Sequence, residues 1–472
     1  MKRIPHTFTI VFALIVFAAM LTWVVPAGEF LRQSVDVGGT VREVVDGNSF
    51  HYTERSPQTW QIFSALFNGF VDKADIIVFI LMVGGAFWIL NNSRAIDVGV
   101  MAFLRSVKRL SRFRLIRWLG VENIIITLVM IMFSLFGAVF GMSEETIAFV
   151  VVFIPLAIQM GFDSIVGVCM CYMAAHIGFA GAMLNPFTIG IAQGIAGLPL
   201  FSGLEYRLFC WAVLTVIGIA FVLWYAHRVK AKPGSSPVHA LDDYWRNRME
   251  GDGESRLSVR QGFILVLFFA TIVALVVGVL KFDWYISEIS ALFLAMGILA
   301  GIIDRQGADD IAKLFLAGCK DILSAALVVG LASGIIFILK DGRVIDTILY
   351  GLTRSLARVG EVTSLGVMYL FQTLLNIVMP SGSAKAALTM PIMAQFADLI
   401  GVSRQTTVLA FQFGDGFTNM LTPTSGVLIG VLGMARIPYG TWLRWVWKFI
   451  LALIVFGFIL MLPTLWLDLP GF

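Results

Sequence analysis

Long apolar runs recur along the whole chain, and they constrain its fold more than any other feature. Of the 472 residues, 58% are hydrophobic and only 14% are charged, whereas soluble domains carry roughly a quarter charged residues. About 20 predominantly apolar residues cross a bilayer as one helix, because backbone polar groups in hydrocarbon must pair within their own segment. The sequence therefore predicts an all-α integral membrane protein and excludes a soluble binding or scaffolding role.

The apolar pattern predicts about nine transmembrane helices, two of them broken, and two helical hairpins. The spans are expected at residues 8–28, 75–92, 163–200, 203–229, 260–280, 287–303, 321–339, 404–436 and 441–466. The hairpins join 121–140 to 144–160, and 362–379 to 386–400. Two amphipathic segments, 58–72 and 305–320, fit equally well a helix lying on the membrane surface and an ordinary loop helix.

The distribution of Lys and Arg predicts the orientation of these spans, since cytoplasmic loops are enriched in both. With the N-terminus inside, the inner side receives 22 of the 34 Lys and Arg residues, the outer side receives 11, and Lys385 falls within the membrane. The dense basic cluster from Arg105 to Arg117 is more typical of a topology anchor than of a nucleic-acid site. We expect a multi-pass protein of the bacterial inner membrane with a cytoplasmic N-terminus and no nucleic-acid partner.

The two halves of the chain resemble each other weakly. An offset of 240 residues places Ser143 on Ser383, and an offset of 237 aligns Met183–Pro186 with Met420–Pro423. The order of segments is also shared, and one extra membrane-crossing helix would invert the second half relative to the membrane. This predicts an inverted-topology repeat, an architecture common among secondary carriers; a chance match of Leu-x-Pro motifs is the alternative.

The repeat divides the chain into three parts. The first repeat would be 1–230, with its hairpin at 121–160 and its broken helix at 163–200. A charged segment with two prolines, 231–258, is expected to be a cytoplasmic linker. The second repeat would be 259–472, with the extra crossing helix at 260–280, its hairpin at 362–400 and its broken helix at 404–436. The polar outer loop 29–58 has no predicted role.

Proline and glycine interrupt two apolar stretches at matching places, Leu184–Gly190 and Thr418–Gly426. Proline removes a backbone donor and clashes with the preceding turn, and unpaired backbone survives in a membrane only inside protein or beside a cavity. An ordinary proline kink is the alternative to a binding site. The site residues expected at the breaks are Asn185, Thr188, Asn419, Thr422, Thr424 and Ser425, of which Asn185, Thr188, Asn419 and Thr422 are candidate Na⁺ ligands.

Polar side chains also gather at the hairpin tips, where a helix N-terminus would offer free N–H groups. The first tip holds Ser143, Glu144, Glu145 and Thr146, and the second holds Ser381, Gly382, Ser383 and Lys385. Charges at mid-membrane are costly and usually functional. Each arm is also long enough to cross the membrane completely, so a tip exposed to bulk water is the alternative. The Lys and Arg distribution does not distinguish the two, because all other segments keep the same side of the membrane in both cases.

Two more polar residues lie within apolar stretches that precede the breaks. His176 precedes the first break and Asp415 the second. Either could relay protons or bind substrate. A hydrogen bond that packs helices together is the alternative for both, and it is the weaker one for Asp415.

The chain resembles the YfcC-like carriers, which are grouped with the DcuC-type C4-dicarboxylate carriers and the ArcD-type arginine/ornithine antiporters. The segments that carry this resemblance are Pro5–Phe8, Thr22–Phe30, Pro380–Ala387 and Phe411–Gly426. The resemblance implies the ion-transporter superfamily fold, a homodimer, and a mobile transport domain that moves like an elevator against a scaffold. Sodium/dicarboxylate relatives carry Ser-Asn-Thr at both tips, whereas this chain has Ser143-Glu144-Glu145-Thr146 and Ser381-Gly382-Ser383-Ala384.

The mixed charges of the predicted site favour an amino acid or a related carboxylate as cargo. Lys385 or the hairpin N–H groups would hold the carboxylate, and Glu144 or Glu145 an amine or guanidinium. Lys385 could instead be a built-in charge, which suits an exchanger. The alternatives are a Na⁺- or H⁺-coupled C4-dicarboxylate carrier and, in another class, a channel. The sequence shows no metalloprotease, nucleophile or nucleotide motif, so we expect no enzyme and no cofactor beyond a coupling Na⁺ or H⁺.

Overall fold

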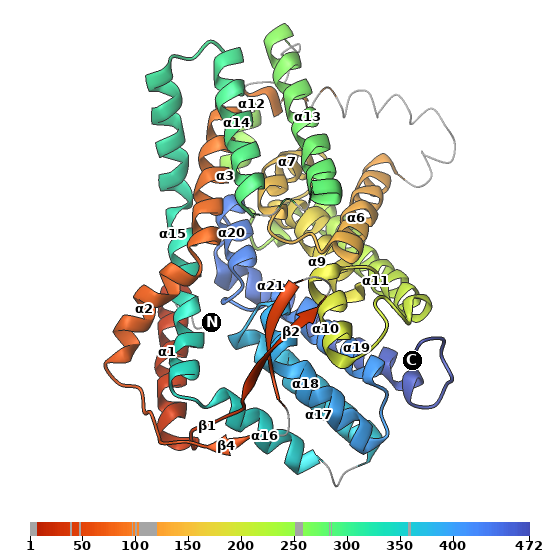
Figure 1. Ribbon diagram of the computed structural model, residues 1–472. Coiled ribbons are helices and arrows are strands. Elements are labelled where there is room, and N and C mark those ends of the chain that lie inside the picture. Colours follow the sequence, from red (N-terminus) through yellow and green to blue (C-terminus); the bar gives the residue numbers. More distant parts are fainter. Residues whose placement is uncertain are drawn as a thin grey trace.

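The computed structural model describes residues 7–37, 40–46, 49–96, 98–99, 102, 120–250, 258–282, 284, 286–356 and 360–472. Helices dominate these residues, and they cross one another in an elongated bundle (Figure 1). The basic cluster from Arg105 to Arg117, the motif residues Pro5 and His6, and residues 251–257 of the linker lie outside the described part of the chain.

The first half follows the predicted order of segments. Its helices are α1 (Thr7–Val24), α2 (Gln61–Asp72), α3 (Ala74–Asn92), α6 (Val121–Phe140), α7 (Thr146–Gln159), α8 (Ser164–Val168), α9 (Ala174–Gly181), α10 (Ile191–Ala196) and α11 (Leu204–Ala231). Two π-helical turns, Cys169–Met173 and Pro186–Gly190, join the pieces of the broken segment. The predicted hairpin and the interruption after residue 181 are both present, and α1 ends two residues before Pro26, which cannot continue a helix.

The linker and the second half contain the remaining elements. The linker holds a 3-10 turn at Pro233–Ser235 and α12 (Asp243–Glu250). The helices of the second half are α13 (Val259–Phe282), α14 (Ile286–Ile303), α15 (Ala308–Asp341), α16 (Ile345–Leu356), α17 (Glu361–Val378), α18 (Gly382–Ile400), α19 (Arg404–Asn419), α20 (Gly426–Ala435) and α21 (Tyr439–Met461), followed by a 3-10 turn at Leu462–Leu465. The helices α12 and α16 have no counterpart in the sequence prediction.

Two predicted boundaries differ from the structure. Segments 305–320 and 321–339 form the single helix α15, because no proline interrupts residues 308–341; this helix bends by 41° between Ala308–Ser324 and Ala326–Asp341. The helix α18 begins at Gly382 rather than at residue 386, since the Lys385 backbone N–H already donates to Ser381 O at 2.8 Å. The polar tip of the second hairpin is therefore the first turn of α18.

The outer loop contains β-structure, so the all-α class is corrected there. Strand β1 (Gly28–Glu29) pairs antiparallel with β4 (His51–Tyr52), and β2 (Arg32–Val37) pairs antiparallel with β3 (Thr40–Val45) in the register Arg32↔Val45. The loop docks on the turn between α15 and α16, where Gly28 N donates to Arg343 O at 2.9 Å and Phe30 N donates to Asp346 Oδ2 at 3.0 Å.

Seven helices in the described part of the chain are long and apolar enough to cross a membrane, and the bent helix α15 is an eighth candidate. The seven are Ala74–Asn92, Val121–Val139, Ser164–Gly181, Leu204–Ala231, Ile286–Ile303, Glu361–Val378 and Tyr439–Leu465. Shorter apolar helices lie at Val11–Val24, Val259–Leu275 and Gly426–Ala435, within three more of the predicted spans. The chain is thus a multi-pass membrane protein, while the count of nine spans stays a prediction.

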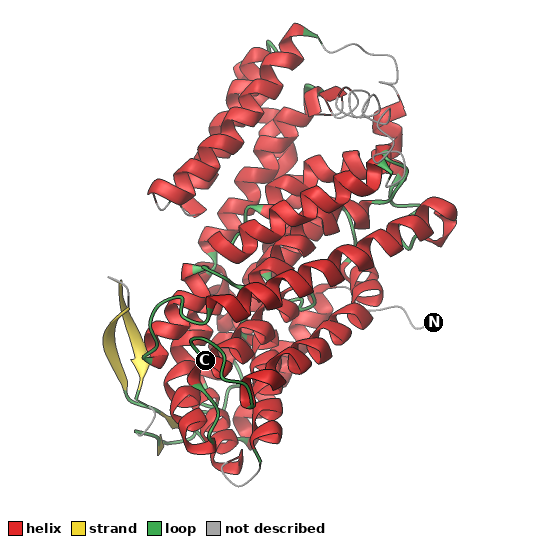
Figure 2. Ribbon diagram, turned by 90° about the vertical axis from the view of Figure 1, so that its right-hand side faces the viewer, coloured by secondary structure: helices red, strands yellow, loops and turns green. Residues whose placement is uncertain are grey.

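The two hairpins enter from opposite ends of the molecule. We call the end that carries α12 the linker end (Figure 1), and the end that carries the strands the loop end (Figure 2). Helix α10, which ends at Ala196, contacts β2 at the loop end. Glu122, at the start of α6, pairs with Lys230 at 3.2 Å. Asp163, just after α7, accepts hydrogen bonds from Tyr225 and Ser236. The hairpin α6–α7 therefore begins and ends at the linker end.

The hairpin α17–α18 begins and ends at the loop end. Arg404 follows this hairpin, pairs with Asp398 of α18 at 2.6 Å and donates to Ala196 O of α10 at 2.7 Å. A Cβ added at Gly401 would lie 3.4 Å from Glu361 Oε1, at the start of α17. The hydrogen bonds from Arg404 also lower the pKa of Asp398, which keeps this carboxylate ionised at the end of the hairpin.

The two broken helices run in opposite directions. Segment α8–α10 starts at the linker end, where Ser164 N donates to Asp242, and finishes at Ala196 beside Arg404. Segment α19–α20 starts at Arg404 and finishes at Arg436, whose guanidinium lies 3.8 Å from the centre of the Tyr244 ring in the linker. Antiparallel breaks and hairpins from opposite ends are the arrangement that an inverted repeat would produce.

Candidate functional site

The interrupted helices lie in the middle of a row of four. Helix α9 packs against α6 and α19, and α19 packs against α17, so the first arms of both hairpins flank the two breaks. In the first half the contact is backbone to backbone. A Cβ added at Gly178 would lie 1.7 Å from Ser134 O, and one added at Gly137 would lie 1.9 Å from Ala175 O. Only glycine permits this approach, as in other close helix crossings in membranes.

Glycines hold the second half in the same manner. A Cβ at Gly414 would lie 2.9 Å from Thr373 N of α17, and one at Gly416 would lie 2.6 Å from Ala180 Cα of α9. The motif that contains Gly414 and Gly416 therefore places α19 directly against both of its neighbours.

A buried arginine stabilises the first break. Helix α9 ends at Gly181, and Ala182 has a φ of 23°, outside the helical region. Arg207 of α11 is 1% exposed, and its guanidinium donates to Ala182 O at 3.1 Å and Met183 O at 3.4 Å. It also donates to the backbone oxygens of Phe201 and Ser202. Arg207 thus satisfies the carbonyls that the break releases, a role that the sequence reasoning missed.

Three side chains do the same at the second break. Tyr172 donates to Asn419 O at 2.9 Å, Trp442 to Met420 O at 2.9 Å, and Tyr439 to Leu421 O at 2.9 Å. The backbone oxygens expected to coordinate Na⁺ there already accept hydrogen bonds from the protein. A Na⁺ site at Asn419 and Thr422 stays a prediction.

The turn between α19 and α20 contacts the end of the second hairpin's first arm. Thr422 and Thr424 share a hydroxyl hydrogen bond of 2.7 Å, and both lie within hydrogen-bond distance of Ile377 O. Ser425 accepts from Leu428 N at 3.3 Å and caps α20, which satisfies one of the first free N–H groups of that helix.

The first hairpin tip packs against the first break. Gly141 is left-handed, with a φ of 71°, and an added Cβ there would lie 2.6 Å from Asn185 Oδ1. Glu145 Oε2 accepts from Ser143 N at 3.1 Å, and Thr146 donates to Ser143 O at 2.5 Å. These bonds make the tip a closed turn. Glu144 is half-buried and interacts electrostatically with Glu145 and with Asp75 of α3.

His176 joins this tip to α9. Its Nδ1 lies 3.1 Å from Tyr172 O, and its Nε2 lies 3.4 Å from Ser143 Oγ. A carbonyl only accepts, so Nδ1 carries the proton, and a neutral ring leaves Nε2 to accept from the Ser143 hydroxyl. The side chain is 1% exposed. This geometry fits the packing interpretation of His176 and leaves the proton relay as a prediction.

The second tip contains a fully buried ion pair. Lys385 Nζ lies 2.9 Å from Asp415 Oδ1, and both side chains have 0% exposure. The ammonium also donates to Asn376 Oδ1 at 3.2 Å and lies 4.8 Å from the centre of the Phe411 ring. Lys385 is therefore engaged inside the protein, an arrangement that favours a built-in charge over a direct carboxylate ligand.

Asn376 connects the helices around this pair. Its amide nitrogen lies within hydrogen-bond distance of Asp415 O (3.2 Å), Thr418 Oγ1 (2.8 Å) and Asn419 Oδ1 (2.9 Å). The sequence reasoning missed Asn376. The signal was a buried polar face at helical spacing on the first arm of the hairpin, made of Tyr369, Gln372, Thr373 and Asn376.

The structure thus gathers the predicted residues around the breaks in two groups. The first-tip group consists of Ser143, Glu145, Thr146, His176 and Asn185, and the second-tip group of Thr188, Gly382, Lys385, Asp415 and Asn419. Thr188 ties the second tip to the first break, because a Cβ at Gly382 would lie 2.6 Å from its Cγ2. Ser383 is half-buried in the first turn of α18. How deep the tips lie in a membrane stays a prediction.

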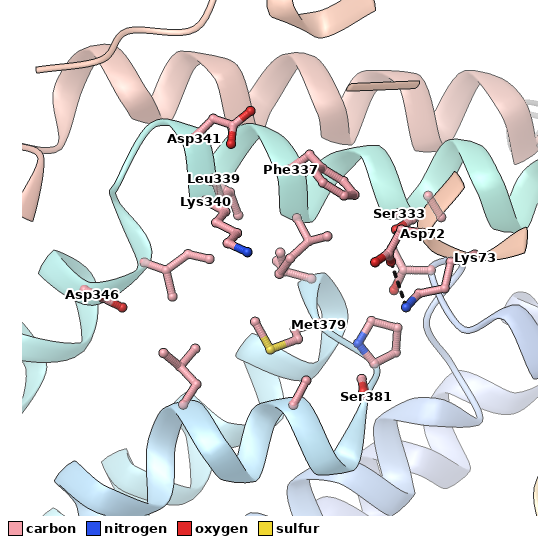
Figure 3. A pocket seen from close by; sticks show the side chains of 18 of the residues that line it. Asp72, Lys73, Ser333, Phe337, Leu339, Lys340, Asp341, Asp346, Met379 and Ser381 are labelled. Atoms are coloured by element: carbon pink, nitrogen blue, oxygen red, sulfur yellow. Dashed lines mark hydrogen bonds and ion pairs between the residues drawn. The ribbon is translucent and has the colours of Figure 1, made fainter. Parts of the chain in front are cut away.

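A cavity of about 910 Å³ opens between the second tip and the helices α2, α3 and α15 (Figure 3). Met379, Ser381 and Ala384 form its side at the tip, and Thr424 and Gly426 reach it from the second break. The opposite wall comes from the α2–α3 turn, the last turns of α15, and the start of the outer loop. The sequence reasoning missed this wall, since its parts are hundreds of residues apart in the chain.

Charges of both signs line this cavity in equal number. Four basic residues (Arg32, Lys73, Lys340, Arg343) and four acidic ones (Glu29, Asp72, Asp341, Asp346) line it. Three pairs are closed within the wall: Lys73–Asp72 at 2.8 Å, Arg32–Asp346 at 3.3 Å and Arg343–Glu29 at 3.3 Å. The exposed Lys340 points into the cavity (Figure 3) and makes no ion pair among the described residues. The wall therefore offers a free ammonium beside partly satisfied carboxylates.

Replacing Arg207 by methionine should destabilise the protein. The change leaves Ala182 O and Met183 O without donors, and hydrogen bonds to charged groups contribute about 1.5–3 kcal/mol each. We expect a loss of about 3 kcal/mol or more, measured as thermal stability in detergent. Arg228→Met on the same helix is the control, because Arg228 is exposed and such changes stay within about 0.5 kcal/mol. Equal stability of the two variants would contradict the role given to Arg207.

Comparison with known proteins gives a consistent family assignment. The family model described as "DcuC: C4-dicarboxylate anaerobic carrier" matches residues 4–465. The "Putative basic amino acid antiporter YfcC" of Escherichia coli (strain K12) is 35% identical over 93% of this chain and 92% of that protein. An uncharacterized protein of Haemophilus influenzae is 29% identical over 97% of this chain and 96% of that protein.

Two solved transporters align along nearly the whole chain. The YdaH transporter of Alcanivorax borkumensis gives a TM-score of 0.41 at 15% identity, covering 97% of both chains. MtrF of Neisseria gonorrhoeae gives a TM-score of 0.40 at 16% identity, covering 99% of this chain and 96% of the other.

Proposed function

The chain belongs to the DcuC family of membrane carriers, and on this premise we propose that it is a secondary active transporter whose cargo is an amino acid. The observation that carries the choice of cargo is the cavity beside the second tip, which four basic and four acidic residues line. A site for a C4-dicarboxylate would be expected to hold an excess of donors and positive charge. Equal numbers of both signs suit a molecule with a carboxylate and an ammonium.

The positions of the charges favour a long cargo within this class. Ser333 and Lys340 are seven residues apart on α15, which is two helical turns or about 10 Å along one face. Ser333 donates to Asp72 Oδ2 at 3.0 Å and so fixes the acidic end of this face. A basic amino acid could place its carboxylate at Lys340, and its side-chain cation would take the place of Lys73 at Asp72. The name of the Escherichia coli relative describes the same class of cargo.

Movement of the cargo by an elevator-like shift is the second part of the proposal. Helices α1, α2, α3, α14 and α15 pack mainly on one another and would form the scaffold. The hairpins and broken helices would form the transport domain, related by an inverted repeat; the opposite directions of the two broken helices support this. Because the cavity lies between these groups, a shift of the second tip along α15 would carry cargo bound at Ser381 across the membrane.

Orientation and assembly complete the proposal. The protein would lie in the bacterial inner membrane as a homodimer, with its N-terminus and its linker end in the cytoplasm. The loop end, whose residues Gly28, Glu29 and Arg32 line the cavity, would then face outwards. The distribution of Lys and Arg supports this orientation.

Counterflow in proteoliposomes tests the proposed cargo. Vesicles loaded with unlabelled arginine should take up labelled arginine saturably, and succinate should not compete. Lys340→Ala should reduce this uptake at least about tenfold, the equivalent of roughly 1.4 kcal/mol. Lys313→Ala, on an exposed turn of the same helix, should not reduce it.

Three results would contradict the proposal in different ways. Succinate uptake without competition by amino acids would favour the dicarboxylate alternative. Flux that does not saturate would favour a channel. Equal uptake by the Lys340→Ala variant and the wild type would mean that the cavity wall is not part of the cargo-binding site.

A further inference from the structure

The carboxylate of Asp415 is fully buried, and its position within the fold requires a cation. Uncompensated charge in a protein interior or a membrane is costly, so a buried carboxylate normally keeps a positive partner. The described residues within reach supply one, the Lys385 ammonium at 2.9 Å. This cation comes from the hairpin tip rather than from solution.

The groups around the ammonium resemble the ligands of a small hard cation. It faces a carboxylate oxygen of Asp415 and the amide oxygen of Asn376, and oxygen donors of these kinds suit hard metal ions. The Asn376 amide nitrogen points the other way, toward Thr418 and Asn419. This orients the Asn376 oxygen toward the ammonium.

The ammonium also joins three separate segments. Lys385 lies in the first turn of α18, Asn376 in α17, and Asp415 in α19 next to the second break. The first break lies close to this point, because a Cβ added at Gly382 would lie 2.6 Å from Thr188 Cγ2 and 3.3 Å from Asp415 Oδ2. A cation here holds the second tip closed against the broken helix, and a dissolved monovalent ion could do the same in place of the lysine.

We propose that the Lys385 ammonium is a tethered cation that fills a monovalent-cation site formed by Asp415 and Asn376, so that the protein needs no Na⁺ at its second tip. The transport consequence rests on the function proposed above: exchange of cargo should proceed without a Na⁺ gradient. The binding consequence stands independently of the cargo. Removal of the lysine side chain should open the site to Na⁺.

Thermal stability of the purified protein in detergent tests the binding consequence. Wild type should melt at the same temperature in NaCl and in choline chloride of equal ionic strength. Lys385→Ala should melt at a lower temperature in choline chloride and recover in a saturable manner as NaCl replaces it, because a ligand that binds only the folded state stabilises it. Lys313→Ala removes an exposed lysine and should show no such recovery.

The double variant Lys385→Ala/Asp415→Ala tests whether the Asp415 carboxylate is the group that binds Na⁺. It lacks the carboxylate and should not respond to Na⁺, whether or not it is as stable as the wild type. Should Lys385→Ala fail to fold in choline chloride, extraction in NaCl must restore a monodisperse protein.

Several outcomes would overturn the proposal. These are Na⁺ stabilisation of the wild type at this site, a Lys385→Ala variant that NaCl does not restore, and Na⁺ recovery that persists without Asp415. None of them depends on which cargo is transported. Failure of arginine counterflow alone would leave the cation site in place.

Discussion

The Gly178→Ala substitution should reduce the yield of folded protein more than any other glycine-to-alanine substitution in the described helices. The new Cβ would lie 1.7 Å from Ser134 O, and the reciprocal contact at Gly137 is almost as close. Both obstacles are backbone, so no side chain can rotate out of the way. Overpacking in cores usually costs about 1–3 kcal/mol, and here α6 and α9 must separate along their whole contact. We expect the upper end of that range or more.

The yield of monodisperse protein and its melting temperature in detergent measure this effect. Gly351→Ala is the matched control, because Gly351 is also helical but has open space where its Cβ would be. That change should be neutral or slightly stabilising, as alanine has the higher helix propensity. If the Gly178→Ala variant were as stable as Gly351→Ala, the first hairpin arm would not pack backbone to backbone on the first break.

Removing one member of the Lys385–Asp415 pair should be far more damaging than removing both. Breaking a buried ion pair typically costs about 3–5 kcal/mol because the remaining charge is unpaired, while apolar residues of similar volume in place of both are often neutral. Lys385→Met and Asp415→Leu should each show this loss in Na⁺-free buffer. The double variant should recover most of it.

A double-mutant cycle of unfolding temperatures measures this coupling. Asp321→Leu and Arg436→Met provide a comparison cycle, since that pair is also close, at 2.6 Å, but is about one-third exposed. Exposed pairs contribute at most about 1 kcal/mol. Additive losses at Lys385 and Asp415 would mean that the two charges do not depend on each other.

The sequence predicts the broken helices well because their cause is local. Pro186 and Pro423 interrupt apolar stretches, and the chain unwinds before each of them. The hairpin tips are predicted for the same reason, since polar residues and glycine separate two apolar arms. These features follow from composition over ten residues or fewer.

Features built from distant residues could not be predicted in this way. Lys385 is recognisable as a costly charge, yet its partners Asn376 and Asp415 are fixed only when α17, α18 and α19 pack together. Arg207 belongs to a membrane span that hydropathy alone predicts. The residues around it in the sequence do not indicate that its guanidinium donates to the carbonyls of Ala182 and Met183. The cavity wall depends on the meeting of α2, α15 and the outer loop.

The central claim is that cargo reaches the second hairpin tip from the loop end of the molecule. Cysteine labelling at Ser381, in a background without the four native cysteines, tests it most directly. Ser381 lines the cavity, whereas Ser143 at the first tip contacts His176. A membrane-impermeant maleimide applied to the loop side should label Ser381→Cys and leave Ser143→Cys unreacted, and arginine should slow the labelling of Ser381→Cys. Labelling of Ser143→Cys from that side, or labelling of Ser381→Cys that no cargo slows, would contradict the account.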